Sequence, residues 1–114
     1  MQTLLKVYGH LYPCDQELEE ELSLALEGAI ANELSKDLPL LERDKDLIRL
    51  SFEGLYFPEE EVLEVIKKHL NPKQHGKIDF LLLDEWRLRR YFLEQGQISS
   101  RETSLNNVLD YSGF

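Results

Sequence analysis

The stretch that decides the fold is residues 77–95, KIDFLLLDEWRLRRYFLEQ, because it fits either one helix or two strands. As a helix, it places its large apolar side chains on one broad face. These are Ile78, Leu81, Leu82, Trp86, Leu88, Phe92 and Leu93. As a hairpin, residues 77–83 and 86–93 would pair across Asp84 and Glu85, but two-residue turns usually need glycine or asparagine. We therefore favour a helix and keep the hairpin as the alternative.

Two features follow from the helical interpretation. Gly96 stands where the C-terminal cap of that helix belongs. Trp86 and Phe92 would share a buried face, while Arg87 and Arg90 would point away from it.

Two helices are predicted before this stretch. The first runs from Asp15, a suitable N-cap, to about Leu34, because its apolar residues recur at three- and four-residue steps. They are Leu18, Leu22, Ala25, Leu26, Ala29, Ile30 and Leu34. The second starts at Pro58, which suits a first helical position, and ends before Asn71 and Pro72.

Two strands are predicted from alternation of apolar and polar residues. Leu5, Val7 and Leu11 alternate with polar or aromatic neighbours, and so do Ile48, Leu50 and Phe52. Between them, residues 35–46 look like a polar loop. We expect a core in which residues of the first helix pack against the second strand and the second helix. Its members are Leu22, Leu26, Ile30, Leu50, Phe52 and Ile66.

These elements predict a small single α+β domain over residues 1–114, with two to four strands and three main helices packed on the sheet. Residues 97–114 are expected to form a partly extended C-terminal tail, with a short helix over 104–111. Part of this tail, residues 94–112, is similar to the C-terminal segment of the M subunit of the photosynthetic NADH dehydrogenase-like complex. The similarity does not reach the rest of the chain, so we assign no family.

Composition narrows the function classes. The 114 residues include 22 acidic and 13 basic side chains, a net charge of −9, which disfavours direct binding to nucleic acid. No apolar run approaches the ~20 residues of a membrane-spanning helix. The single cysteine, Cys14, cannot form an internal disulfide, which fits a reducing compartment. We therefore expect a cytoplasmic protein.

No motif predicts a catalytic residue, a cofactor or a metal site. Residues 71–82 have the spacing of a calcium loop, but Lys73 and Leu82 stand where oxygen ligands are needed. His69 and His75 have no obvious third ligand, and the many carboxylates single out no catalytic pair.

Two groups of residues are candidates for partner binding. The first is an acidic cluster of Glu17, Glu19, Glu20 and Glu21, which would suit a partner with a basic surface. The second is the group of Trp86, Arg89 and Tyr91, residue types that often anchor interfaces.

The favoured hypothesis is a non-enzymatic protein-binding domain: a regulator, an assembly factor or an accessory subunit. One alternative is an acidic inhibitor of the immunity-protein type, which mimics nucleic acid at a basic site. A second alternative is a small enzyme with an unrecognised site. Uncovered sheet edges would also allow a homodimer.

Overall fold

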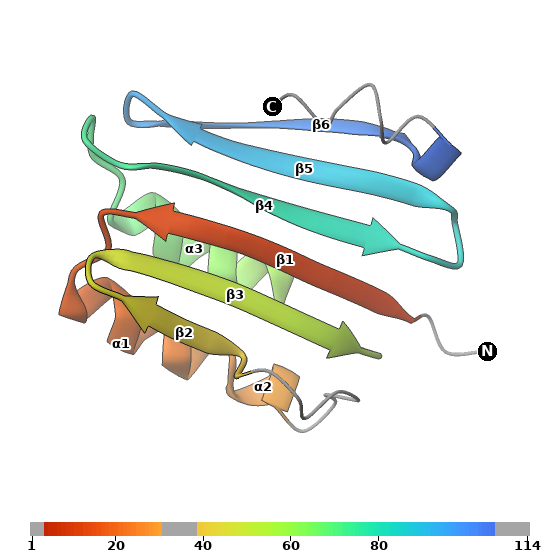
Figure 1. The fold of residues 1–114 in the computed structure, drawn as a ribbon, viewed down its shortest axis with the longest axis horizontal. Coiled ribbons are helices and arrows are strands. Elements are labelled where there is room, and N and C mark those ends of the chain that lie inside the picture. The colour runs from red at the N-terminus through yellow and green to blue at the C-terminus, as the bar shows by residue number, and fades with distance from the viewer. Residues whose placement is uncertain (1–3, 31–38, 107–114) are drawn as a thin grey trace.

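The computed structural model describes residues 4–30 and 39–106, which form one antiparallel sheet with helices on one of its faces (Figure 1). The strands are β1 (Leu5–Tyr12), β2 (Leu41–Asp44), β3 (Leu47–Gly54), β4 (His75–Leu82), β5 (Arg87–Glu94) and β6 (Gln97–Ser104). The helices are α1 (Gln16–Ala25), α2 (Glu27–Ile30) and α3 (Glu59–Lys68). The six strands lie in the order β2-β3-β1-β4-β5-β6.

The first seven elements explain this order. β1 lies between β3 and β4 and is antiparallel to both. The connections through α1 and α3 both cross the same face of the sheet (Figure 1). Apart from the single turn of α2, this is the split βαβ arrangement of a βαββαβ unit. β5 and β6 extend it as a meander beyond β4.

The helix that we favoured for residues 77–95 is wrong, because these residues belong to the β4–β5 hairpin. Ile78 and Phe80 face the helices together with Tyr91 and Leu93 of β5, whereas Leu81 and Leu88 pair on the other face of the sheet. The connection is not the two-residue turn that we considered. It spans residues 83–86, and Trp86 itself adopts a positive φ of 55°.

Gly96 is a turn residue rather than a helix cap. It follows Gln95 in the two-residue connection between β5 and β6, and both have positive φ, 54° and 75°. Helix ends and tight hairpins share this requirement for positive φ, so the glycine alone could not separate them.

The fold class that we predicted is therefore wrong in its proportions. The sheet has six strands rather than two to four, and the three helices of the described chain are short. The first helix stops at Ala25, with Leu26 as its C-cap, and residues 31–34 of our prediction lie outside the described part. β2 was missed because it is a polar edge strand, in which only Leu41 marks the buried side.

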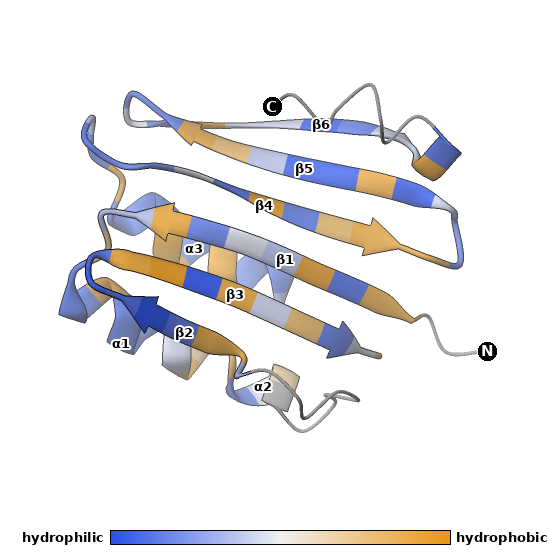
Figure 2. Cartoon of the chain, viewed as in Figure 1, coloured by the Kyte–Doolittle hydropathy of each residue, from blue (hydrophilic) through white to orange (hydrophobic). Residues whose placement is uncertain are grey.

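The core lies between the sheet and the two longer helices (Figure 2). The prediction is confirmed for five of its residues, each at most 6% exposed: Leu22, Leu26, Leu50, Phe52 and Ile66. The side chain of Ile30 lies outside the described part. Trp86 and Arg90 reverse our expectation, because Trp86 is 53% exposed and Arg90 only 7%. Arg90 forms an ion pair with Asp79 on the neighbouring strand, from Nε to Oδ1 at 2.5 Å.

Strand residues that point away from the helices form the opposite face of the sheet. Tyr8 and Tyr12 of β1 are 40% and 43% exposed there. Lys6 pairs with Glu53 across β1 and β3. Among the described residues, no helix is long and apolar enough to cross a membrane.

Candidate partner-binding groove

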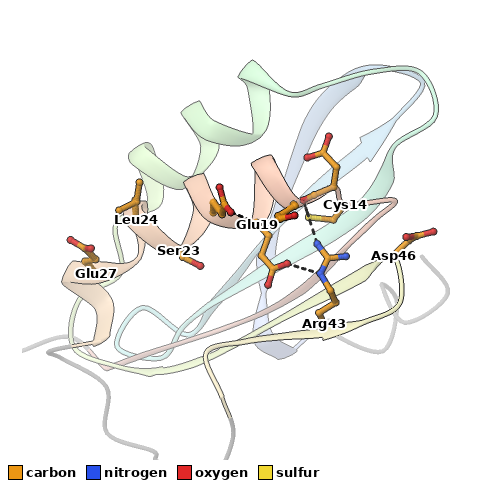
Figure 3. Close-up of a pocket in the computed structure, with 10 residues that line it drawn as sticks. Cys14, Glu19, Ser23, Leu24, Glu27, Arg43 and Asp46 are labelled. Carbon is orange, nitrogen blue, oxygen red and sulfur yellow. Dashed lines mark hydrogen bonds and ion pairs between the residues drawn. The ribbon is translucent and has the colours of Figure 1, made fainter.

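A groove of about 890 Å³ runs between α1 and the hairpin formed by β2 and β3 (Figure 3). Its lining comes from the turn before α1, from α1 itself, from the start of α2 and from the hairpin. The lining residues are Cys14, Asp15, Gln16, Glu19, Glu20, Ser23, Leu24, Glu27, Arg43 and Asp46. Five of these carry a carboxylate and only Arg43 carries a positive charge, so the groove is acidic.

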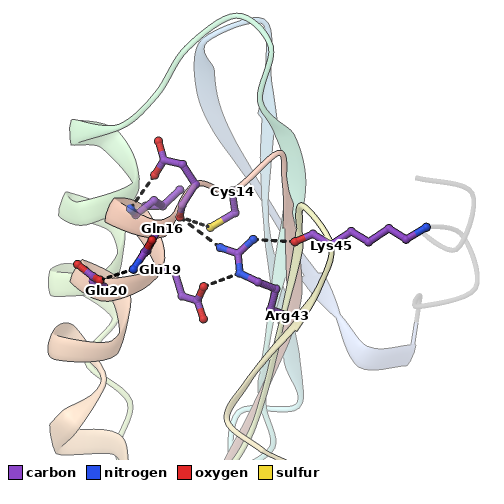
Figure 4. A network of polar contacts seen from close by, with 8 residues as sticks. Cys14, Gln16, Glu19, Glu20, Arg43 and Lys45 are labelled. Atoms are coloured by element: carbon purple, nitrogen blue, oxygen red, sulfur yellow. Dashed lines mark hydrogen bonds and ion pairs between the residues drawn. The ribbon is translucent and has the colours of Figure 1, made fainter.

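Arg43, which lines the groove, joins the hairpin to the start of α1 (Figure 4). Its Nε donates to Glu19 Oε1 at 2.5 Å, and its other nitrogens donate to the carbonyls of Lys45 at 2.7 Å and Asp15 at 3.3 Å. The hydrogen bond to Glu19 raises the pKa of Arg43, which therefore remains charged. The pair of Glu19 and Arg43 thus fixes the shape of the groove.

The start of α1 is held by its own side chains. Asp15 Oδ1 accepts a hydrogen bond from the backbone N–H of Leu18 at 2.8 Å, which confirms Asp15 as the N-cap. Gln16, the first helical residue, donates to Glu20 one turn further along the helix at 3.0 Å. These contacts order the helix end that forms one wall of the groove.

The outer rim of the groove is acidic and has one apolar side chain. Glu20, Glu27 and Asp46 are exposed. Leu24, which comes between Glu20 and Glu27 in the sequence, is 66% exposed. An exposed leucine is common on protein surfaces, but here it adjoins a hollow and several carboxylates. The rim can therefore offer both charge and a small apolar contact to a ligand.

Cys14 does not supply a nucleophile to this groove. It is 2% exposed, and its Sγ donates to the Asp15 carbonyl at 3.6 Å. Burial raises the pKa of the thiol to about 11, so it is protonated at neutral pH. A thiol in this state is a poor nucleophile and a poor metal ligand.

The acidic cluster of Glu17, Glu19, Glu20 and Glu21 does not form one patch. Only Glu19 and Glu20 line the groove. Glu17 and Glu21 are one turn apart on the flank of α1 that faces α3, where Glu21 forms ion pairs with Lys68 and His69. Successive helix positions differ by about 100°, which places neighbours in the sequence on different sides of the helix.

Trp86, Arg89 and Tyr91 lie away from the groove. Arg89 Nη1 donates to Glu59 Oε2 at 2.9 Å, and the Tyr91 hydroxyl donates to the same oxygen at 2.5 Å. Burial, and then the Glu59 carboxylate, raise the pKa of Tyr91 to about 12. Trp86 lies on the β4–β5 turn, where its Nε1 donates to Asn106 Oδ1 at 2.9 Å. Arg89 and Tyr91 are therefore engaged with α3.

Of the ten residues that line the groove, only Glu19 and Glu20 were predicted from the sequence as binding residues. Those not predicted include Leu24, Glu27, Arg43 and Asp46. Leu24 gave a usable signal, because it is a leucine that falls off the apolar stripe of its helix. Arg43 and Asp46 gave none, because the segment around them looked like a loop. In comparisons with known proteins, no family model, no curated protein and no solved structure matches this chain.

Proposed function

We propose that this chain is a non-enzymatic, cytoplasmic protein-binding domain whose acidic groove receives a basic segment of a partner protein. The observation that carries the proposal is the groove itself, with its carboxylates and the exposed Leu24. The free, buried Cys14 supports a reducing compartment. The negative groove makes phosphate-rich nucleic acid an unfavourable ligand.

Charge and apolar contact have different roles in this proposal. Exposed carboxylates such as Glu20, Glu27 and Asp46 speed the encounter with a basic partner more than they strengthen the complex. The lasting affinity has to come from apolar groups that the partner covers. Leu24 is the apolar residue on the groove that is placed for this, so the bound segment should combine lysine or arginine with an apolar side chain.

The groove is also formed before any partner binds. Arg43 links the hairpin to the start of the helix through two hydrogen bonds, to Glu19 and to the Asp15 carbonyl, so the two walls are held in place before a partner arrives. A preformed site loses less conformational entropy on binding.

Parallel affinity capture with two charge-matched variants tests the proposal. Glu20→Lys with Glu27→Lys reverses two charges on the groove, and Glu60→Lys with Glu64→Lys reverses two exposed charges on α3. A partner that binds the groove should be retained by the wild type and the α3 variant and lost by the groove variant. Circular dichroism checks that all three proteins are folded.

The captured partner then has to meet a second requirement. Its binding segment, made as a peptide, should be basic and should bind more weakly to a Leu24→Asp variant than to the wild type. Equal capture by the groove variant, or an acidic or uncharged binding segment, would reject the proposal.

A further inference from the structure

We infer that Glu17, Glu21 and His69 form a binding site for one divalent transition-metal ion, typified by Zn²⁺, between α1 and the end of α3. The ligand atoms of the three side chains all lie within 4.8 Å of one another. The set comprises one imidazole and two carboxylates, the nitrogen and oxygen ligands that Zn²⁺ commonly takes in proteins. This site is on the opposite flank of α1 from the groove and does not depend on it.

The two helices bring these residues together from distant parts of the sequence. Glu17 and Glu21 are separated by one turn of α1, so their side chains lie on the same side of the helix. His69 is the C-cap residue of α3 and comes 48 positions after Glu21. Its side chain is 13% exposed, so packing restricts the ring before any ion binds.

The two oxygens of Glu21 have separate partners. Lys68 Nζ lies 2.6 Å from Oε1, whereas Oε2 faces Nε2 of His69. A carboxylate can accept several contacts at once, so Lys68 can stay on Oε1 while Oε2 binds an ion.

The third ligand completes the site with a small movement. Glu17 is exposed at the start of α1, so its side chain can turn toward the ion without disturbing the core. Three protein ligands leave room for water in the coordination shell. The imidazole nitrogen selects against Ca²⁺ and Mg²⁺, which prefer oxygen ligands throughout.

Isothermal titration of the chelator-treated protein with ZnCl₂ tests this inference. The expected result is one Zn²⁺ per chain, with affinity reduced about tenfold or more in Glu17→Gln and further in His69→Gln. Glu20→Gln, which replaces the carboxylate directly before Glu21 in the sequence, should bind Zn²⁺ like the wild type, and so should His75→Ala. MgCl₂ and CaCl₂ should give no saturable signal.

Glu17→Gln keeps the test decisive if His69→Gln fails to fold, because Glu17 is exposed and its replacement leaves the pairs of Glu21 intact. The absorption bands of Co²⁺, used as a probe for Zn²⁺, should appear in the wild type and weaken in Glu17→Gln. The inference would be overturned by the absence of saturable Zn²⁺ binding. Binding that is unchanged in Glu17→Gln, or lost in His75→Ala instead, would overturn it equally.

Discussion

The two flanks of α1 carry similar side chains but have different surroundings. On the flank toward α3, Glu21 is engaged by Lys68 and His69, and Glu17 is beside this pair. On the flank toward the β2–β3 hairpin, Arg43 engages Glu19, while Glu20 and Glu27 stay on the exposed rim of the groove. The number of acidic residues therefore says little about binding. What matters is which cations the fold places against each carboxylate.

The largest effect in this comparison should come from the buried side of α1, which supports both flanks. Leu26 is 1% exposed, so Leu26→Ala removes buried methyl groups and leaves a cavity. We expect a loss of about 2–5 kcal/mol in the free energy of unfolding, measured in a urea melt. A loss below about 1 kcal/mol would show that the helix packs less tightly than the structure indicates.

A smaller effect is expected when the groove flank loses its cation. Arg43→Ala removes two hydrogen bonds between the hairpin and the start of α1 and one within the hairpin. It should lower the free energy of unfolding by about 1 kcal/mol because the pair with Glu19 is partly exposed. Arg43→Lys should restore less than half of the loss, because an ammonium group cannot reproduce the guanidinium fork. Full recovery with lysine would mean that charge alone holds the groove together.

The smallest expected effect is a difference between the two flanks in how their carboxylates change the melting temperature with pH. The pKa of Glu21 is lowered in the folded protein by the hydrogen bond from Lys68 and then by that from His69. The ionised carboxylate therefore stabilises the fold at any pH above the ordinary pKa of glutamate. This contribution disappears as the pH falls through the lowered pKa. Glu21→Gln should therefore reduce the melting temperature at neutral pH, and this reduction should shrink as the pH falls below the ordinary range of a glutamate pKa.

Glu20→Gln provides the matched comparison for that experiment. Glu20 accepts one hydrogen bond from Gln16 on the same helix and has no ion pair among the described contacts. Its replacement should change the melting temperature less than Glu21→Gln at neutral pH. Equal effects of the two substitutions would contradict the proposed difference between the flanks.

The elements that could be predicted from the sequence are those with a regular apolar pattern. β1, β3, α1 and α3 were found because each carries a regular apolar pattern toward one core. Residues 77–95 were assigned wrongly because apolar residues lie on both faces of the β4–β5 hairpin, so the sequence shows no clear strand period there. The deciding contacts, the pairing of β4 with β1 and with β5, are not local in the sequence.

The site could be predicted only in part. Glu19 and Glu20 stood out as members of an acidic run, and both line the groove. Their separation from Glu17 and Glu21 follows from helix geometry and was within reach of sequence analysis. The opposite wall was not, since Arg43 belongs to an edge strand without an apolar pattern.

The most direct test of the binding groove is the association rate of the captured partner, measured by stopped-flow fluorescence at low and high salt. If the groove attracts a basic segment, reversing Glu20 and Glu27 to lysine should slow association at low salt by about tenfold or more. The same double reversal at Glu60 and Glu64 of α3 should have a much smaller effect, and added salt should narrow the difference between the two variants. Equal association rates for the two variants at low salt would contradict the account.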